Sequence, residues 1–209
     1  PRGGGGGGGG DDSELHLLLL SRGITVVDNV SVLQGGSASE DIPIIDTDEE
    51  WRYFKGTVAP PANWTALDFD DAAWLRGQTG IGFGDNDDRT VLTDMRNSYV
   101  SIFCRKVFTA ADIDEITELV LKVTIDDGFI AYINGVEVTR SSINSGSGPS
   151  AEGIDGHESK GWELFPLGSG AELAHRLGKG RVVLAVEGHN STKSSSDFTL
   201  APCLIGPPL

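Results

Sequence analysis

The hydrophobic residues of this chain lie in short runs and alternating segments that Gly, Asn, Asp and Pro interrupt. Alternation with a period of two is typical of half-buried β-strands, and few segments show the helical period. The clearest signal is Asn134-Gly135 between two β-like runs, which predicts a hairpin with a type I′ turn. The strands predicted after the N-terminal part are Ile44–Ile45, Trp51–Thr57, Val100–Phe108, Glu118–Ile125, Phe129–Ile133, Val136–Arg140, Glu163–Pro166, Arg181–Gly188 and Phe198–Ile205.

The segments with helical character are short, and each predicts a single turn. These turns are Phe69–Trp74, with Asp70 as the capping residue, Thr109–Ile116 and Ala171–Leu177. A chain with many short strands and few helical turns is typical of an all-β fold. We therefore predict an antiparallel β-sandwich or jelly roll.

The N-terminal part of the chain has a composition of its own, with eight successive glycines from Gly3 to Gly10. After this arm, Ser13–Leu20 and Ile24–Leu33 have the pattern of two strands, and Ser21–Gly23 has the residues of a turn. The predicted boundaries are a glycine-rich arm at 1–12, a β-hairpin at 13–35, a linker at 36–43 and the sandwich at 44–209.

A lone two-stranded hairpin is marginally stable in water, so its apolar side chains need a further surface. That surface is the sandwich of the same chain, a preceding domain or another copy of the chain. For contact between copies we predict β-strand addition. The alternation of the second strand places its apolar residues on one face. The residues that we assign to this assembly contact are Leu15, Leu17, Leu19, Ile24, Val26, Val30 and Val32.

Charge and hydropathy exclude several partners. The 209 residues include 16 Lys and Arg against 31 Asp and Glu, which gives a formal net charge of -15. A chain this acidic without a basic stripe repels phosphate backbones, so we expect no nucleic-acid partner. The longest apolar runs, such as Leu17–Leu20, are far shorter than the ~20 residues that cross a bilayer. We therefore expect no membrane insertion.

The cysteines Cys104 and Cys203 leave two interpretations open. They are two buried thiols that behave as small apolar groups, or they form a disulfide if their strands are neighbours.

The densest polar cluster is Gly82–Thr90, and it predicts a candidate metal site. Asp85, Asp87 and Asp88 offer several carboxylate oxygens, which are the ligands that Ca²⁺ prefers. The spacing departs from the EF-hand loop because the glycine and the closing glutamate are absent from their positions. A solvated acidic loop is the alternative.

A second group of polar residues is the candidate ligand site. Asp126 and Asp127 precede the predicted Asn134-Gly135 hairpin, and Arg140 follows it. Carboxylates and a guanidinium at a sheet edge hydrogen-bond sugar hydroxyls, and His189 and Asn190 follow another predicted strand. The alternative is a tight turn in which the aspartates cap backbone amides.

Neither the histidines nor the serines predict catalysis. The four histidines lack metal-ligand spacing, so there is no zinc signature. His189 and the following serines and Asp197 match a Ser/His/Asp triad in composition alone, and no G-x-S-x-G nucleophile elbow occurs. We therefore expect no enzyme. Aromatic residues stack on sugar rings or fill the core; those considered are Trp51, Tyr53, Trp64, Trp74, Tyr99 and Trp162.

An ordered series of motifs over residues 44–205 resembles the galactose-binding-like jelly-roll modules of large secreted bacterial proteins. The resemblance implies a sandwich of eight or more strands, extracellular or cell-surface placement, no catalysis, glycan binding and a structural calcium ion. Cys104 departs from the aromatic or aliphatic residue expected there. Residues 13–33 also resemble the last two strands of a similar sandwich. The motifs are Trp51–Gly56, Trp64, Phe69–Trp74, Gly80–Asp85, Phe103–Phe108, Asp126–Gly128, Asn134-Gly135, Arg140, Leu184–Asn190 and Ser195–Asp197.

Two functions follow from these observations. The first is a non-catalytic extracellular structural subunit that assembles with other copies of itself through the arm and hairpin. Strand exchange of this kind is head-to-tail and propagates into a filament or surface layer unless a ring closes. The alternative is a carbohydrate-binding accessory module of a secreted multidomain protein.

Overall fold

A computed structural model describes residues 24–27, 30–33, 42–109, 118–148, 152–169, 172 and 180–206. The chain divides into two units, residues 1–40 and 41–209. In the first unit, β1 (Ile24–Val27) pairs antiparallel with β2 (Val30–Leu33). The prediction of one strand over Ile24–Leu33 is therefore wrong.

In the sequence, Asp28 and Asn29 stand between these two strands, and both are residue types that favour turns. Pairing joins Ile24 to Leu33 and Val27 to Val30. The prediction places Ile24, Val26, Val30 and Val32 on one face of a single strand. In the structure the first two belong to β1 and the last two to β2. The glycine arm and the predicted strand Ser13–Leu20, with Leu15, Leu17 and Leu19, lie outside the described residues.

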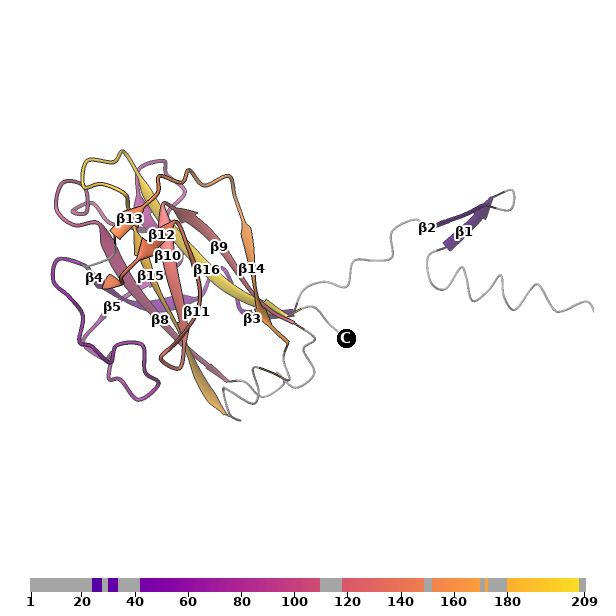
Figure 1. The fold of residues 1–209 in the computed structure, drawn as a ribbon, viewed down its shortest axis with the longest axis horizontal. Coiled ribbons are helices and arrows are strands. Elements are labelled where there is room, and N and C mark those ends of the chain that lie inside the picture. Colours follow the sequence, from indigo (N-terminus) through magenta and orange to yellow (C-terminus); the bar gives the residue numbers. More distant parts are fainter. Residues whose placement is uncertain are drawn as a thin grey trace, which may run out of the picture. The chain divides into compact units, whose positions relative to one another are not determined.

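The second unit is an antiparallel β-sandwich of two sheets (Figure 1). Sheet 1 has the strand order β11-β10-β15-β8-β4-β5, and sheet 2 has the order β14-β9-β16-β6-β7, with β3 paired to β16. The parallel pair among these sheets is β6 with β7. The strands of sheet 1 are β4 (Glu50–Lys55), β5 (Leu75–Gln78), β8 (Ser101–Thr109), β10 (Gly128–Ile133), β11 (Val136–Ser141) and β15 (Arg181–His189). Those of sheet 2 are β3 (Ile42–Ile45), β6 (Ile81–Phe83), β7 (Thr90–Val91), β9 (Leu119–Asp126), β14 (Glu163–Gly168) and β16 (Phe198–Gly206).

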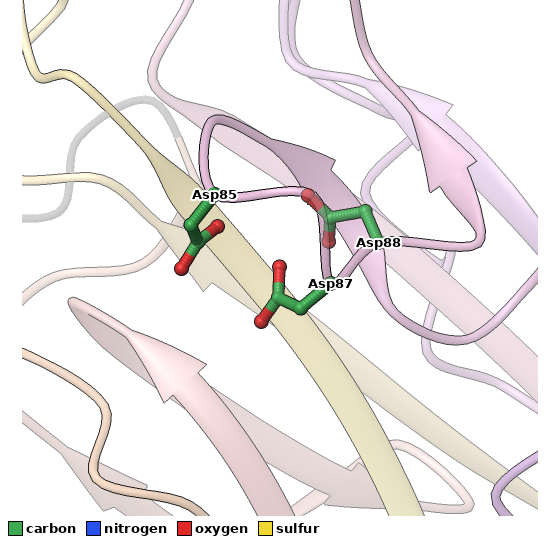
Figure 2. A group of neighbouring side chains, drawn as sticks. All are labelled: Asp85, Asp87 and Asp88. Carbon is green, nitrogen blue, oxygen red and sulfur yellow. The ribbon is translucent and has the colours of Figure 1, made fainter.

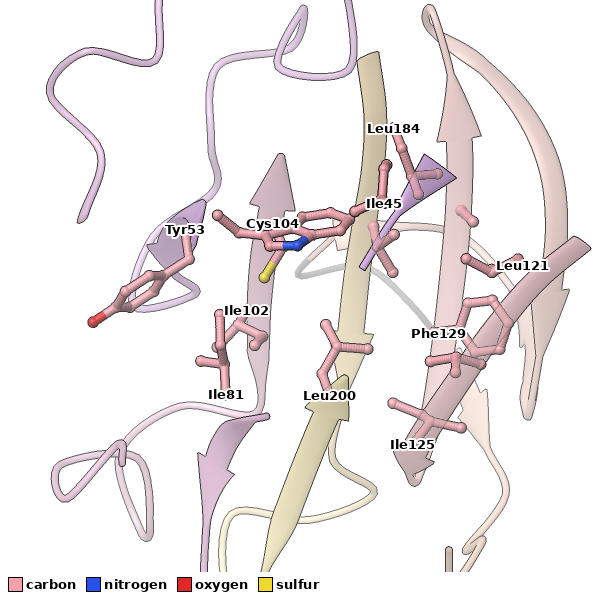
Figure 3. Close-up of a cluster of buried hydrophobic side chains, with 14 of the residues drawn as sticks. Ile45, Tyr53, Ile81, Ile102, Cys104, Leu121, Ile125, Phe129, Leu184 and Leu200 are labelled. Carbon is pink, nitrogen blue, oxygen red and sulfur yellow. The ribbon is translucent and has the colours of Figure 1, made fainter. Parts of the chain in front are cut away.

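The core lies between the two sheets and is built from alternate residues of the longer strands (Figure 3). In β9, Leu121, Val123 and Ile125 are fully buried, whereas Lys122 and Thr124 between them are partly exposed. Burial of each such apolar side chain contributes roughly 1.5–3 kcal/mol. The predicted all-β antiparallel sandwich is confirmed, and the period-two pattern is its cause.

Every strand predicted after residue 43 occurs, with ends shifted by one or two residues. The Asn134-Gly135 hairpin also occurs, because both residues take the positive φ that this turn requires, 47° and 86°. The sequence did not predict β5, β6 and β7, nor β12 (Ile143–Ser145), which pairs with β13 (Glu152–Ile154).

The single turn predicted at Phe69–Trp74 occurs, because the Trp74 amide donates to the Asp71 carbonyl at 2.9 Å, but it is not helical. Asp70 does cap the turn, since its Oδ1 accepts a hydrogen bond from the Ala72 amide at 3.0 Å. The other two predicted turns lie mainly outside the described residues. No helix in the described part of the chain is long and apolar enough to span a membrane.

The outer face of sheet 1 is covered by the segment 56–74. Trp64 and Trp74 pack against Phe103 of β8 there, with the two indole centroids 6.1 Å apart. Both cysteines are buried, free thiols, so the thiol interpretation is confirmed. Cys104 lies in sheet 1 and Cys203 in sheet 2.

Candidate functional site

The outer face of sheet 2 presents small and polar side chains where the inner face is apolar. In β9, Thr124 and Asp126 alternate with the core residues, and in β16 Thr199 and Ala201 do the same. The register places Thr199 opposite Asp126 and Ala201 opposite Thr124. These four residues therefore form one patch on two neighbouring strands.

A cavity of about 220 Å³ lies over this patch. Trp162, which precedes β14, stands beside it with 44% of its side chain exposed, and the Lys122 Nζ lies 5.0 Å from its ring centroid. Arg89 Nη2 and Asp48 Oδ1 form an ion pair at 2.7 Å on the cavity wall. The lining is Thr47, Asp48, Thr79, Gly80, Asp87, Arg89, Thr124, Trp162, Thr199 and Ala201.

Trp162 is the exposed member of the six aromatic residues considered for sugar stacking. The other five are core residues with 8% exposure or less: Trp51, Tyr53, Trp64, Trp74 and Tyr99. Trp162 is thus the one of the six whose ring is available to a ligand.

The loop between β6 and β7 brings Asp85, Asp87 and Asp88 together (Figure 2). One carboxylate oxygen from each lies within 4.8 Å of the others. Asp88 accepts a hydrogen bond from Thr199 Oγ1 at 2.8 Å, and its Oδ2 is buried without a hydrogen-bond partner. Burial is the main cause that raises the pKa of Asp88 to about 7. Burial and the neighbouring Asp85 raise the pKa of Asp87 as well.

Four of the five residues predicted to bind a ligand lie at one end of the sandwich. Asp127 follows β9, and His189 and Asn190 stand at the end of β15, where Gly128 pairs with His189. Asp127 uses both carboxylate oxygens on backbone amides, Oδ1 from His157 at 2.7 Å and Oδ2 from Ser191 at 2.6 Å. This is the capping role of the alternative interpretation.

Asn190 and His189 are buried there too. The Asn190 Nδ2 donates to the Asp197 carbonyl at 2.7 Å, and its Oδ1 accepts from the Thr192 amide at 3.2 Å. His189 is 1% exposed, and its Nε2 lies 3.8 Å from Glu187 Oε1, beyond hydrogen-bond distance. Asn190 thus holds the loop together, and neither side chain lies on an open surface.

Arg140, the fifth residue, has a guanidinium group that is already bound. It binds Glu137 through Nε and Nη2, both at 2.6 Å, and donates from Nη1 to the Gly146 carbonyl at 3.1 Å. Its planar fork is therefore already engaged by a carboxylate. The role of Arg140 in ligand binding stays a prediction.

The structure adds two residues that the sequence reasoning missed. Glu158 and Asp197 come within 4.8 Å of Asp126, measured between carboxylate oxygens. Asp126 is 8% exposed, and burial followed by the charges of Asp127, Asp197 and Glu158 raises its pKa to about 7. No local signal in the sequence joins these three segments.

A second cavity, of about 270 Å³, lies on sheet 1 and is lined by five basic side chains. Four of them form ion pairs with Glu49, Glu50 or Asp71, and these are Arg52, Arg76, Arg105 and Lys106. The basic side chains around this cavity therefore belong to a network of ion pairs that links the covering segment to the strands. Most of their positive charge already has an acidic partner.

Comparison with known proteins supports the fold and goes no further. No protein-family model matches the chain, and no curated protein matches it. Among solved structures, a β-glucuronidase of Bacteroides uniformis is 13% identical with a TM-score of 0.53, and the match covers 81% of this chain and 18% of that one. A β-glucuronidase of an uncultured Clostridium species is 11% identical with a TM-score of 0.48 over 83% of this chain and 30% of that one.

A third match is a β-glucuronidase from glycoside hydrolase family 2, 17% identical with a TM-score of 0.43 over 76% of this chain. The chain spans 15% to 30% of the length of these three proteins. The match to the Bacteroides uniformis protein supports a β-sandwich fold.

Proposed function

We propose that this chain is a non-catalytic carbohydrate-binding module of the galactose-binding-like class, part of a secreted protein, and that it binds glycan on the outer face of sheet 2. The observation that carries the proposal is Trp162, exposed beside a polar cavity in a molecule whose other tryptophans are buried. An exposed aromatic face next to directed polar groups is the usual composition of a small-molecule site.

The cavity wall supplies what a sugar requires. The ion pair on the wall uses Arg89 Nη2 and Asp48 Oδ1, so the other N–H groups of Arg89 and the second oxygen of Asp48 remain for vicinal hydroxyls, and Thr124 adds a hydroxyl to the lining. Ala201 and Gly80 are small, so they leave the depth of the cavity free. A ring that rests on Trp162 has polar partners along one edge.

The test is calorimetric titration of the full chain with a panel of soluble polysaccharides. Trp162→Ala removes the stacking face, and we expect it to lower the affinity at least about tenfold, or ~1.4 kcal/mol. Val136→Ala is the control, because Val136 is also exposed (60%) but lies in sheet 1. Arg140→Ala tests the other candidate ligand site, which the sequence predicts at Arg140, Asp126 and Asp127. Equal affinity of the Trp162→Ala variant and the unaltered chain contradicts this location, and failure of all glycans to bind contradicts the function.

Calcium at Asp85, Asp87 and Asp88 belongs to the same proposal. What supports it is the gathering of three carboxylates and the Asp88 oxygen that lacks a hydrogen-bond partner. A calcium ion bound to the folded state alone raises stability, by ~2.7 kcal/mol at a hundredfold excess over Kd. The melting temperature in calcium and in chelator measures this rise, and Asp85→Asn is expected to reduce it.

Self-assembly outside the cell through the N-terminal part is the second candidate. What supports it is the pairing of β1 with β2 in a two-stranded sheet, a unit that is marginally stable in water without a further surface. Deletion of residues 1–35 is expected to convert an assembled species into a monomer in sedimentation velocity. If the shortened chain sediments as an assembly of the same number of chains as the full chain, assembly through this segment is contradicted.

A further inference from the structure

The outer face of sheet 1 carries a row of arginines across three neighbouring strands. Arg76 of β5 pairs with Arg52 of β4, and Arg52 pairs in turn with Arg105 of β8. Residues that stand directly opposite each other in antiparallel strands share a face of the sheet, and like charges in such positions repel. The row therefore costs free energy unless anions lie beside it.

Arg181, the first residue of β15, adds a fourth guanidinium to the same face. Ala185 of β15 pairs with Arg105 and packs in the aromatic cluster on this face. Every second residue of a strand projects from one face, so Arg181 and Ala185 share it. Arg181 is exposed and makes no ion pair or hydrogen bond with any residue that the structure describes. Its positive charge therefore has no acidic partner in that part of the chain.

The four arginines and Lys106 line the cavity of about 270 Å³ on sheet 1. In the described residues, the ion pairs of these five cations involve three carboxylates, those of Glu49, Glu50 and Asp71. The cations thus exceed their acidic partners by two charges, in a chain whose formal net charge is -15. A cavity with a surplus of one sign of charge attracts ligands of the opposite sign. The surplus here favours an anionic ligand.

Asp71 binds one of the two arginines that share it more closely than the other. Its Oδ2 accepts from Arg105 Nε at 2.9 Å, whereas its Oδ1 stands 3.8 Å from Arg52 Nε, beyond hydrogen-bond distance. Arg52 donates from Nη1 to the Trp74 carbonyl at 3.2 Å, and Arg76 uses Nη1 in its ion pair. The Nη2 groups of Arg52 and Arg76 are therefore the donors that these bonds leave over. Guanidinium groups of this kind match the oxygens of a carboxylate, phosphate or sulfate.

We propose that this cavity binds one oxoanion group, a carboxylate, phosphate or sulfate, of a small molecule. Arg52 and Arg76 donate hydrogen bonds to the oxoanion, and Arg181 attracts it through its unpaired charge. Arg105 keeps its structural part, because its donors hold Asp71 and the carbonyls of the covering segment. The volume lies just below the range of about 300–1,000 Å³ for drug-sized ligands, so the cavity suits an anion no larger than one sugar acid or sugar phosphate.

The experiment is calorimetric titration of the full chain at low ionic strength with gluconate, glucose 6-phosphate and inorganic phosphate. Glucose is the neutral control ligand. Arg181→Gln is the test variant, because the residue is exposed and makes no contact that the fold needs in the described part of the chain. Arg96→Gln is the matched control, since it removes the same charge from an exposed turn before β8, whereas Arg181 pairs with Thr109 at the other end of that strand.

We expect Arg181→Gln to lower the affinity for each oxoanion at least about fivefold, and Arg96→Gln to change it by less than about twofold. Tighter binding of the sugar anions than of inorganic phosphate assigns the site to an organic anion, and equal binding assigns it to the free anion; both support an oxoanion site. The proposal is overturned if no oxoanion binds, if glucose binds as tightly as glucose 6-phosphate, or if the two variants bind alike.

This site does not rest on the proposed glycan cavity, which lies on sheet 2. Trp162→Ala is therefore expected to keep the affinity for oxoanions within about twofold. Loss of oxoanion binding in Trp162→Ala, with Arg181→Gln unaffected, places the anion in the other cavity and overturns the proposal. Failure of every neutral glycan to bind, with oxoanion binding intact, contradicts the proposed function alone.

Discussion

Arg105 is the buried cation on which the covering segment of sheet 1 depends, and its removal gives the sharpest test of the fold. The side chain is 1% exposed. Its Nε binds Asp71 Oδ2 at 2.9 Å, its Nη1 donates to the carbonyls of Trp64 and Ala66, and its Nη2 donates to that of Phe69. One guanidinium therefore ties β8 to four points of the segment 56–74.

The cost of Arg105→Ala follows from these contacts. Removal of one partner of a buried ion pair costs about 3–5 kcal/mol, because the other charge stays buried. Asp71 is 22% exposed in its side chain and keeps Arg52 Nε at 3.8 Å, so water and that second cation relieve part of the penalty. We expect destabilisation near the lower end, about 3 kcal/mol.

Urea unfolding measures this free energy. With a slope of about 2 kcal/mol/M, the midpoint falls by about 1.5 M. Acrylamide quenching gives a local readout, because Trp64 is 7% exposed only while the segment stays in place. Arg76→Ala is the control: its pair with Glu50 is 3.0 Å long but more than half exposed on both sides, and such pairs contribute at most about 1 kcal/mol. An Arg105→Ala variant as stable as Arg76→Ala, with Trp64 still protected, refutes the reasoning.

Three smaller predictions address the sheets and the titrating groups. Gly82→Ala is expected to cost about 3 kcal/mol or more in urea unfolding, because its Cβ stands 1.9 Å from a carbonyl of β16, whereas Gly156→Ala meets its nearest neighbour at 3.8 Å and is nearly neutral. Burial raises the pKa of Cys203 to about 11 and that of Cys104 further, so neither thiol is expected to react with a disulfide reagent near ~pH 8 until the chain unfolds; fast labelling of the native chain contradicts this. The hydrogen bond that Lys55 Nζ donates to Asp94 Oδ1 at 2.8 Å lowers the pKa of Asp94. The ionised Asp94 carboxylate therefore stabilises the fold above the unfolded pKa near ~4, and this stabilisation is lost as the pH falls through the lowered pKa. We expect Asp94→Asn to be less stable than the unaltered chain by up to about 1 kcal/mol near neutral pH, and equally stable in strong acid.

The long strands of the fold could be predicted because their alternation follows the burial of their side chains. In β9, the partly exposed Lys122 and Thr124 alternate with buried apolar residues, and β16 is an almost continuous buried run; both patterns are evident in the sequence. β5 could not be predicted, because Leu75–Gln78 is largely exposed and holds its place through pairing with β4. Short strands of this kind form because they pair with a neighbouring strand, and the local sequence does not show which strand that is.

The candidate site shows the same division between local and distant information. Asp85, Asp87 and Asp88 are neighbours in sequence, so their gathering follows from one loop. The engagement of Arg140 by Glu137 depends on a bulge, since Tyr132 pairs with Glu137 while Ala131 pairs with Thr139, which leaves one extra residue in β11.

The register of strands far apart in sequence decides the rest of the site. Asp126 meets Glu158 and Asp197 only because β9 pairs with both β14 and β16. That pairing is a property of the assembled sheet, and a single sequence does not encode it in any local pattern.

The outer faces of the two sheets differ in how far side chains cover them. On sheet 1, Trp64 and Trp74 close the outer face, and Arg105 keeps them there by binding the carbonyls of their own segment. On sheet 2, the corresponding outward positions hold Thr124 and Ala201, which are too small to close the face and leave a cavity instead. Aromatic burial therefore stabilises one side, and the missing bulk on the other side leaves part of the sheet uncovered. A substitution at Arg105 should thus affect stability before binding, and one at Trp162 should affect binding without stability.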